Sequence, residues 1–248
     1  MDKLILGDCL EKLNEIEDNS INLVITSPPY NVDLGNNKFN KFSYNEYKDN
    51  KEHKEYINWL KSIFEKIYPK LKDDGRVCIN IGDGKNGSIP THSDTIQFMK
   101  ELDYNPYSII IWNKNTVSNR TAWGSWLSPS SPSYPSPFEY ILIFYKNNKK
   151  LTHKGETDLT KEEFTTYAYG LWTFAPEKNL KKLGHPAAFP VELPYRLIKM
   201  NSYKGDVVLD PFMGSGTVGL VCKQLERDFI GIELNKDYFE LAKTRIEV

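Results

Sequence analysis

Short apolar segments alternate with amphipathic helical segments in both terminal parts of this 248-residue chain. Strand-like runs lie at residues 3–8, 21–26, 76–83, 107–114, 139–146, 207–212 and 229–234. Helix-like runs, with apolar residues three or four apart, lie at 9–18, 55–75, 92–104, 190–206, 216–227 and 236–246. Such alternation is typical of a mostly parallel sheet with helices on both faces. We therefore expect an α/β fold.

The alternation of strand-like and helix-like runs stops in the middle of the chain. Residues 114–138 are rich in proline and serine and read as loop, and residues 147–184 are basic, polar and aromatic without a clear period. We expect a core made of 1–113 and 185–248 together with strand 139–146, and an inserted region at 114–184. That region has ten Lys/Arg against six Asp/Glu, whereas the whole chain has a net charge of −1. It is therefore the candidate anion-facing part, although a solvated surface would explain the same charges.

Composition narrows the class of protein further. No apolar run approaches the roughly 18–20 residues of a membrane span, and the first residues do not resemble a secretory signal. Cys9, Cys78 and Cys222 are isolated and odd in number, so neither a disulfide framework nor a zinc site is indicated. We expect a cytoplasmic protein with reduced core cysteines, no metal and no membrane partner.

The segment VVLDPFMGSGTVG follows a predicted strand and opens a predicted helix. In α/β sheets ligands bind beyond the carboxyl ends of strands, so residues 210–217 lie where a cofactor would sit. The segment is neither GxGxxG nor a phosphate-binding loop. Glu233 ends the next strand, where an acidic residue usually pairs with ribose hydroxyls. A nucleoside cofactor without pyrophosphate fits, and S-adenosylmethionine has that make-up, with a sulfonium cation suited to Asp210. A tight turn with a solvent-facing carboxylate is the alternative.

The segment TSPPY, residues 26–30, also follows a predicted strand. Two prolines fix φ and remove two N–H donors, so the carbonyl groups of this turn keep their direction. The hydroxyl of Ser27 and the carbonyl of Pro28 could accept the two N–H groups of an exocyclic amine, which would localise its lone pair toward a methyl donor. Tyr30 could stack on a base that has left the duplex. The turn is predicted to be a base clamp, and a plain turn with a packed tyrosine is the alternative.

In this order the motifs resemble the amino-group DNA methyltransferases of the N4-cytosine/N6-adenine family, in the permuted β-type arrangement. The resemblance covers nearly the whole chain, through LILGDCLEKL, SPPYN, GRVCINIGD, TAWGSW, HPAAFPVELPYRLI, VVLDPFMGSGTVG and FIGIELNKDYFELAKTRI. It implies a Rossmann-like methyltransferase fold with an antiparallel strand, S-adenosylmethionine as cofactor, and a target-recognition region at 114–184.

The resemblance also assigns roles to residues. It implies that Ser27, Pro28, Pro29 and Tyr30 are catalytic. It implies a cofactor site made of Asp8, Thr26, His185, Phe189, Asp210, Pro211, Phe212, Gly214, Ser215, Gly216, Thr217 and Glu233. Within this set, Glu233 would hold the ribose, Asp8 would face the adenine, and His185 and Phe189 would close over the methionine end. Asp8 is equally suited to capping a helix that begins at the next residue.

Cytosine C5 chemistry is disfavoured, because in that family the nucleophilic cysteine follows a proline and no cysteine of this chain does. Within the resembled family a leading serine goes mostly with N4-cytosine and an aspartate mostly with N6-adenine, so Ser27 favours cytosine N4. N6-adenine is the alternative. An RNA methyltransferase would usually carry asparagine at this position, and a catalytically silent DNA-binding module would not need the clamp.

The expected partner is duplex DNA, with a restriction endonuclease as a possible cognate partner. In the middle region the candidate DNA contacts are Arg120, Trp123, Ser125, Lys149 and Lys150, the basic residues for phosphates, and Arg120, Trp123 and Ser125 for bases. Packing of the tryptophans against the core is the alternative. The polar stretch 31–51 is expected to be a loop that orders over DNA.

Overall fold

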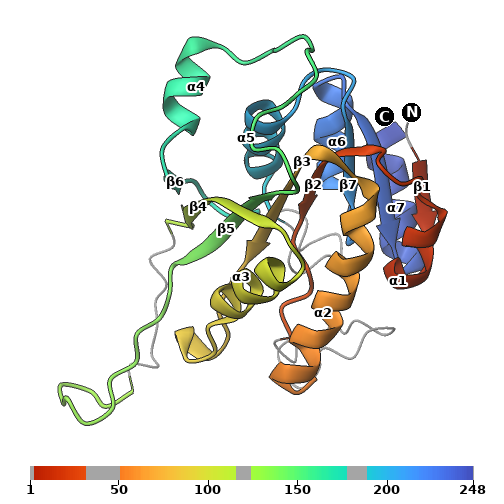
Figure 1. The fold of residues 1–248 in the computed structure, drawn as a ribbon. Coiled ribbons are helices and arrows are strands. Elements are labelled where there is room, and N and C mark those ends of the chain that lie inside the picture. The colour runs from red at the N-terminus through yellow and green to blue at the C-terminus, as the bar shows by residue number, and fades with distance from the viewer. Residues whose placement is uncertain (1–2, 32–50, 116–123, 178–188, 248) are drawn as a thin grey trace.

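The computed structural model describes residues 3–31, 51–115, 124–177 and 189–247. The described strands form one eight-stranded sheet in the order β1-β8-β7-β2-β3-β5-β4-β6 (Figure 1). The strands are β1 (Lys3–Leu6), β2 (Ile21–Thr26), β3 (Leu71–Ile81), β4 (Asn105–Asn113), β5 (Phe138–Tyr145), β6 (Leu171–Thr173), β7 (Val207–Asp210) and β8 (Asp228–Glu233).

Within this sheet β5 alone runs against its neighbours. It is antiparallel to β3 on one side and to β4 on the other, while the remaining described neighbours pair in parallel. This confirms the expected mostly parallel sheet with one antiparallel strand. Because parallel strands point the same way, the carboxyl ends of β1, β8, β7, β2 and β3 meet at one edge.

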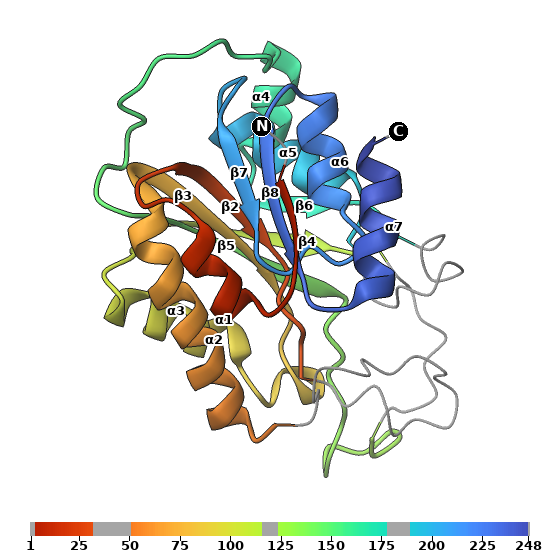
Figure 2. The same cartoon turned by 90° about the vertical axis from the view of Figure 1, so that its right-hand side faces the viewer.

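Helices cover both faces of the sheet (Figure 2). They are α1 (Cys9–Lys12), α2 (His53–Ile67), α3 (Thr91–Glu101), α4 (Lys161–Tyr167), α5 (Glu192–Asn201), α6 (Thr217–Gln224) and α7 (Lys236–Glu247). The first three pack on one face in a single buried cluster, and α5, α6 and α7 contribute to the cluster on the other face. The fold is therefore doubly wound, as the alternation predicts.

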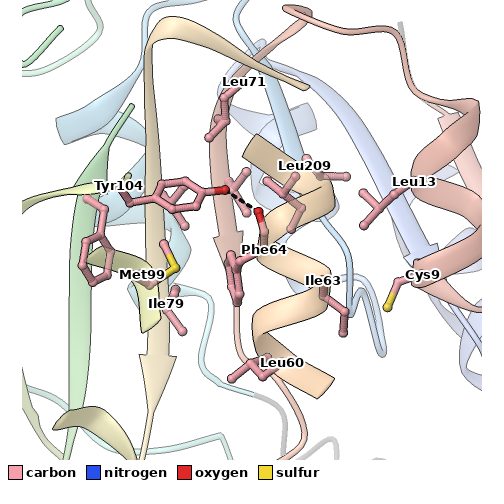
Figure 3. Close-up of a cluster of buried hydrophobic side chains, with 14 of the residues drawn as sticks. Cys9, Leu13, Leu60, Ile63, Phe64, Leu71, Ile79, Met99, Tyr104 and Leu209 are labelled. Carbon is pink, nitrogen blue, oxygen red and sulfur yellow. Dashed lines mark hydrogen bonds between the residues drawn. The ribbon is translucent and has the colours of Figure 1, made fainter. Parts of the chain in front are cut away.

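The central position of β2 follows from its sequence, INLVIT, in which all six residues are buried. A strand covered on both faces needs a nearly continuous apolar run rather than an alternating one. On the α1–α3 face, Phe64 of α2 packs near Tyr104, whose hydroxyl donates a 2.8 Å hydrogen bond to the Phe64 carbonyl (Figure 3). The one polar atom of the Tyr104 side chain is thus satisfied inside an apolar cluster.

The helix expected to continue to Gly75 ends earlier, and the expectation was wrong at that end. Helix α2 stops at Ile67, and β3 begins at Leu71. Pro69 explains the change, because proline has no N–H to continue a helical ladder. Leu71 is instead paired with Ile21 of β2.

The middle of the chain contains two elements that periodicity could not predict, because the sequence there has no clear period. Helix α4 begins with a capping box, in which Thr160 accepts from the backbone of Glu163 and Glu163 accepts from the backbone of Thr160. Strand β6 pairs with β4, and its Trp172 is buried in the α5–α7 cluster. The T-x-x-E pattern of this capping box is present in the sequence and could have predicted the start of α4. Strand β6, at three residues, was too short to read.

None of the described helices is long and apolar enough to cross a membrane.

Candidate active site

The tips of β2 and β7 adjoin, and a hydrogen bond between side chains joins them. These neighbouring parallel strands end at Thr26 and Asp210, and the Thr26 hydroxyl donates to Asp210 Oδ1 at 2.8 Å. Both side chains are buried. The TSPPY turn and the glycine-rich turn therefore begin side by side, as the sequence predicts.

The glycine-rich turn is held by the Asp210 side chain and by a backbone hydrogen bond to β8. Asp210 Oδ1 also accepts from the Phe212 N–H at 3.0 Å, and the Met213 N–H bonds to the Ile232 carbonyl of β8. Gly214 and Gly216 have φ values of 53° and 76°, in the left-handed region that glycine adopts without strain. A Cβ on Gly216 would lie 2.8 Å from Ala242 Cβ, so this glycine also allows α7 to pack closely.

Glu233 ends β8 beside this turn. Its Oε2 accepts from the Gly214 N–H at 2.7 Å and its Oε1 from the Asn235 N–H at 2.8 Å. A carboxylate has about four acceptor positions. Glu233 therefore holds the glycine-rich turn, and its carboxylate oxygens are of the kind that accept from hydroxyl groups such as those of a ribose.

Burial raises the pKa of Asp210 to about 7. The hydrogen bonds from Thr26 and the Phe212 N–H lower that pKa, and the charge of Glu233 raises it. A carboxyl group removed from water in this way gains from a cationic ligand, which would stabilise its ionised form. The site thus suits a ligand with a positive charge near β7.

The clamp residues lie on a polar network that the motifs do not predict. Ser27 Oγ donates to the Tyr30 hydroxyl at 3.0 Å, and that hydroxyl donates to Glu139 Oε2 at 2.9 Å. Asn80 Nδ2 donates to the same hydroxyl at 2.7 Å, and Lys114 pairs with Glu139.

Asn80 and Glu139 interrupt the apolar strand sequences INIGD and FEYILIF. A polar residue inside such an apolar run is the sequence signal that could have identified them. Pro28 is buried and Pro29 is half-buried in the same turn.

Asp8 has the capping role that its position allows. Its Oδ1 accepts from the Leu10 N–H at 2.8 Å at the start of α1. The preceding Gly7 donates its N–H to the Glu233 carbonyl at 2.8 Å, which places Asp8 at the same edge as Glu233. The contact of Asp8 with an adenine ring stays a prediction.

The remaining cofactor candidates are distributed around the glycine-rich turn. Pro211, Ser215 and Thr217 are buried, and Arg245 of α7 donates to the Ser215 carbonyl and to Thr217 Oγ1. Phe212 packs 5.7 Å from Trp59 between ring centroids, and Phe189 packs on the α5–α7 cluster. Their contacts with a cofactor stay predictions, and His185 lies outside the described residues.

The DNA-contact candidates are not brought together. Ser125 lies in a hairpin closed by the Gly124–Pro132 bridge, where it bonds to Ser128 and Ser131. Lys149 and Lys150 are exposed but lie beyond the far end of β5. Because β5 is antiparallel to β3, its last residue, Tyr145, pairs with Arg76, while Tyr140 pairs with Ile81 at the carboxyl end of β3, so the chain carries both lysines away from the clamp. Charge alone could not reveal that reversal.

Arg120, Trp123 and the stretch 32–50 lie outside the described residues. The three cysteines are buried, and within the described ranges no group of His, Cys, Asp or Glu could hold a metal ion.

A doubly wound α/β sheet with two adjoining motif-bearing strand tips is the arrangement of a protein that binds a nucleotide-like ligand beyond the carboxyl ends of its strands. Residues 21–244 match the N6_N4_Mtase family, described as "DNA methylase". The chain belongs to this family of DNA methyltransferases.

Known relatives agree with the assignment. The chain is 40% identical over 171 residues to the type II methyltransferase M.MjaVI of Methanocaldococcus jannaschii, covering 68% of this chain and 84% of that protein. It is 32% identical to M.MjaI of the same organism, covering 99% of this chain and 91% of the relative. Among solved structures, a DNA modification methylase from Thermus thermophilus, complexed with S-adenosyl-L-methionine, matches with a TM-score of 0.76 and 28% identity, over 99% of this chain and 93% of that one. The cytosine-N4-specific PvuII DNA methyltransferase matches with a TM-score of 0.71 and 26% identity, over 98% and 85%.

Family membership makes S-adenosylmethionine the cofactor, and the residues at the tips of β7 and β8 fit it. The buried Asp210 carboxyl suits its sulfonium cation, Glu233 has acceptors for its ribose, and the glycine-rich turn lies between them. When bound, the cofactor supplies an electrophilic methyl group. The chain's part is then to orient an amine acceptor at the neighbouring tip of β2.

Proposed function

We propose that this chain methylates the N4 amine of cytosine at a specific site in duplex DNA, as the modification enzyme of a restriction-modification system. The observation that carries the proposal is the position of Ser27, an oxygen acceptor directly after Thr26, whose side chain is bonded to Asp210. A target amine at Ser27 would face a methyl donor held at the next strand tip. Reaching that position requires the base to leave the duplex.

Two comparisons support the finer parts of the proposal. The PvuII enzyme, to which the chain is similar over 98% of its length, is described as cytosine-N4-specific. The relatives M.MjaVI and M.MjaI are described as type II methyltransferases. The leading serine of the clamp favours the same base.

The hairpin after β4 is the proposed DNA contact. The described residues 124–137 lead into β5, whose first residue, Phe138, pairs with Asn113 of β4 at the edge that carries the clamp. Trp126 and Tyr134 are exposed by 67% and 77%. Exposed aromatic rings on a projecting hairpin suit stacking or wedging against bases.

The test is the chemical identity of the product. DNA from cells that express the chain would be digested to nucleosides and analysed by mass spectrometry, and sequencing of the methylated positions would give the recognition site. We expect N4-methylcytosine. N6-methyladenine as the sole product would overturn the choice of base while leaving the family assignment intact.

A further inference from the structure

Five side chains from four separate segments form a connected hydrogen-bond network beneath the clamp. Ser27 and Tyr30 come from the turn after β2, Asn80 from β3, Lys114 from the residue after β4, and Glu139 from β5. Asn80 and Glu139 are buried, at 2% and 8% exposure. The contacts between them all lie within hydrogen-bonding distance.

The direction of each bond in this network follows from Glu139. Its Oε1 faces the Lys114 ammonium, and its Oε2 lies 2.9 Å from the Tyr30 hydroxyl and 2.8 Å from Asn80 Nδ2. A carboxylate can only accept, so the single proton of the Tyr30 hydroxyl is donated to Glu139. The Asn80 amide must likewise present its nitrogen, since its oxygen would repel the carboxylate.

The Tyr30 oxygen can therefore only accept from Ser27. Their oxygens are 3.0 Å apart, and with the tyrosine proton committed to Glu139, the proton between them must belong to Ser27. The Ser27 hydroxyl then points its hydrogen inward and keeps a lone pair for the substrate. An amine N–H needs that acceptor, whereas a hydroxyl that donated would compete for the nitrogen lone pair that attacks the methyl group.

We propose that Glu139, held by Lys114, is a positioning residue that acts through Tyr30 to keep the Ser27 hydroxyl an acceptor for the target amine. The proposal rests on the proposed transfer to an exocyclic amine, and it adds a requirement for Glu139 that the SPPY motif does not contain. It also assigns the Tyr30 hydroxyl a role separate from stacking by its ring. Phenylalanine could stack in its place but could not transmit the orientation.

Glu139→Gln is the informative substitution. One glutamine oxygen cannot satisfy Lys114, Tyr30 and Asn80 together. The Lys114 ammonium can only donate and is the charged donor of the three, so the amide oxygen stays with it and the NH₂ faces the Tyr30 hydroxyl. The tyrosine proton then turns toward Ser27, and the serine hydrogen turns toward the substrate amine. We expect the single-turnover methylation rate to fall by at least about tenfold, with the dissociation constants for S-adenosylmethionine and DNA within about twofold of the wild type.

Glu163→Gln is the matched control. Glu163 is also bonded to a lysine, Lys199 at 2.6 Å, and to a tyrosine hydroxyl, Tyr195 at 3.3 Å, but it lies in α4, away from the clamp. It should lose comparable packing and keep the wild-type methylation rate. Thermal unfolding of both variants would verify that each is folded.

A double-mutant cycle separates orientation from general damage. If Glu139 acts through the Tyr30 hydroxyl, Glu139→Gln should lower the rate little further in a Tyr30→Phe background. Additive losses, or a wild-type rate in the Glu139→Gln variant, would overturn the proposal. Failure of the proposed transfer to an exocyclic amine would look different, because the wild-type enzyme itself would then produce neither N4-methylcytosine nor N6-methyladenine.

Discussion

Asp210 is a carboxyl group that the fold removes from water at the tip of β7, and its raised pKa is the most informative single value in the site. The ordinary aspartate value of 3.8 is raised to about 7, mainly by burial. The group is therefore largely protonated below neutral pH and ionised above it. A cation bound beside it would favour the ionised form.

Cofactor affinity should depend on pH for this reason. Between about pH 6 and about pH 8 the affinity for S-adenosylmethionine should rise by up to roughly tenfold as Asp210 loses its proton. Isothermal titration calorimetry across this range would measure it. The Asp210→Asn variant should bind more weakly and with no such slope.

S-adenosylhomocysteine, which lacks the sulfonium charge, is the control ligand for that experiment. Its affinity should change less with pH. Equal slopes for both ligands would contradict a direct role for the charge of Asp210.

The hairpin closed by the Gly124–Pro132 bridge exposes apolar side chains that do not contribute to the packed core. The chain between this hairpin and β5 is held to the sheet by the Lys114 N–H, which bonds to the Pro137 carbonyl at 3.0 Å, whereas Leu127 in the hairpin is 88% exposed. Apolar side chains that gather on an exposed surface indicate a binding surface.

Trp126→Ala should therefore weaken DNA binding without weakening cofactor binding. Loss of one stacking ring is worth about 1–3 kcal/mol, so we expect a roughly fivefold to hundredfold rise in the DNA dissociation constant. Fluorescence anisotropy with a labelled duplex would measure it. Phe164→Ala removes an aromatic residue that is 54% exposed on α4, at the other end of the molecule, and should change little (Figure 1). Equal effects of the two substitutions would argue against the hairpin as the contact.

The whole molecule is less modular than the composition of its middle section indicates. Residues 171–173 belong to a region expected to recognise DNA, yet they form the edge strand β6 of the catalytic sheet. Trp172 is 1% exposed, donates to the Tyr167 carbonyl at 3.1 Å and lies under the Arg196 guanidinium. This section therefore stabilises the sheet as well as extending it.

Trp172→Ala should destabilise the entire protein. Removing a fully buried tryptophan costs about 3–5 kcal/mol, and a urea denaturation curve would show the loss as a lower midpoint. Trp126→Ala should leave the midpoint nearly unchanged, because its ring is exposed. A loss below about 1 kcal/mol at Trp172 would indicate that β6 is not part of the cooperative unit.

Local patterns in the sequence are sufficient to predict the doubly wound sheet and the two motif-bearing strand tips. The reason is that the signals for these elements are local: the apolar runs in INLVIT and VVLDPF indicate buried strands, and the prolines and glycines that follow indicate turns. The end of α2 at Ile67 was also within reach, since Pro69 marks it. Resemblance of the ordered motifs adds the cofactor and the reaction.

Only the tertiary structure decides which distant side chains meet. Asn80 and Glu139 reach Tyr30, and Lys114 reaches Glu139, because β3, β5 and β4 are neighbours in that order. The direction of β5 brings Glu139 to the clamp and carries Lys149 away from it. Strand order and direction result from packing the whole chain, so no local pattern of residues can specify them.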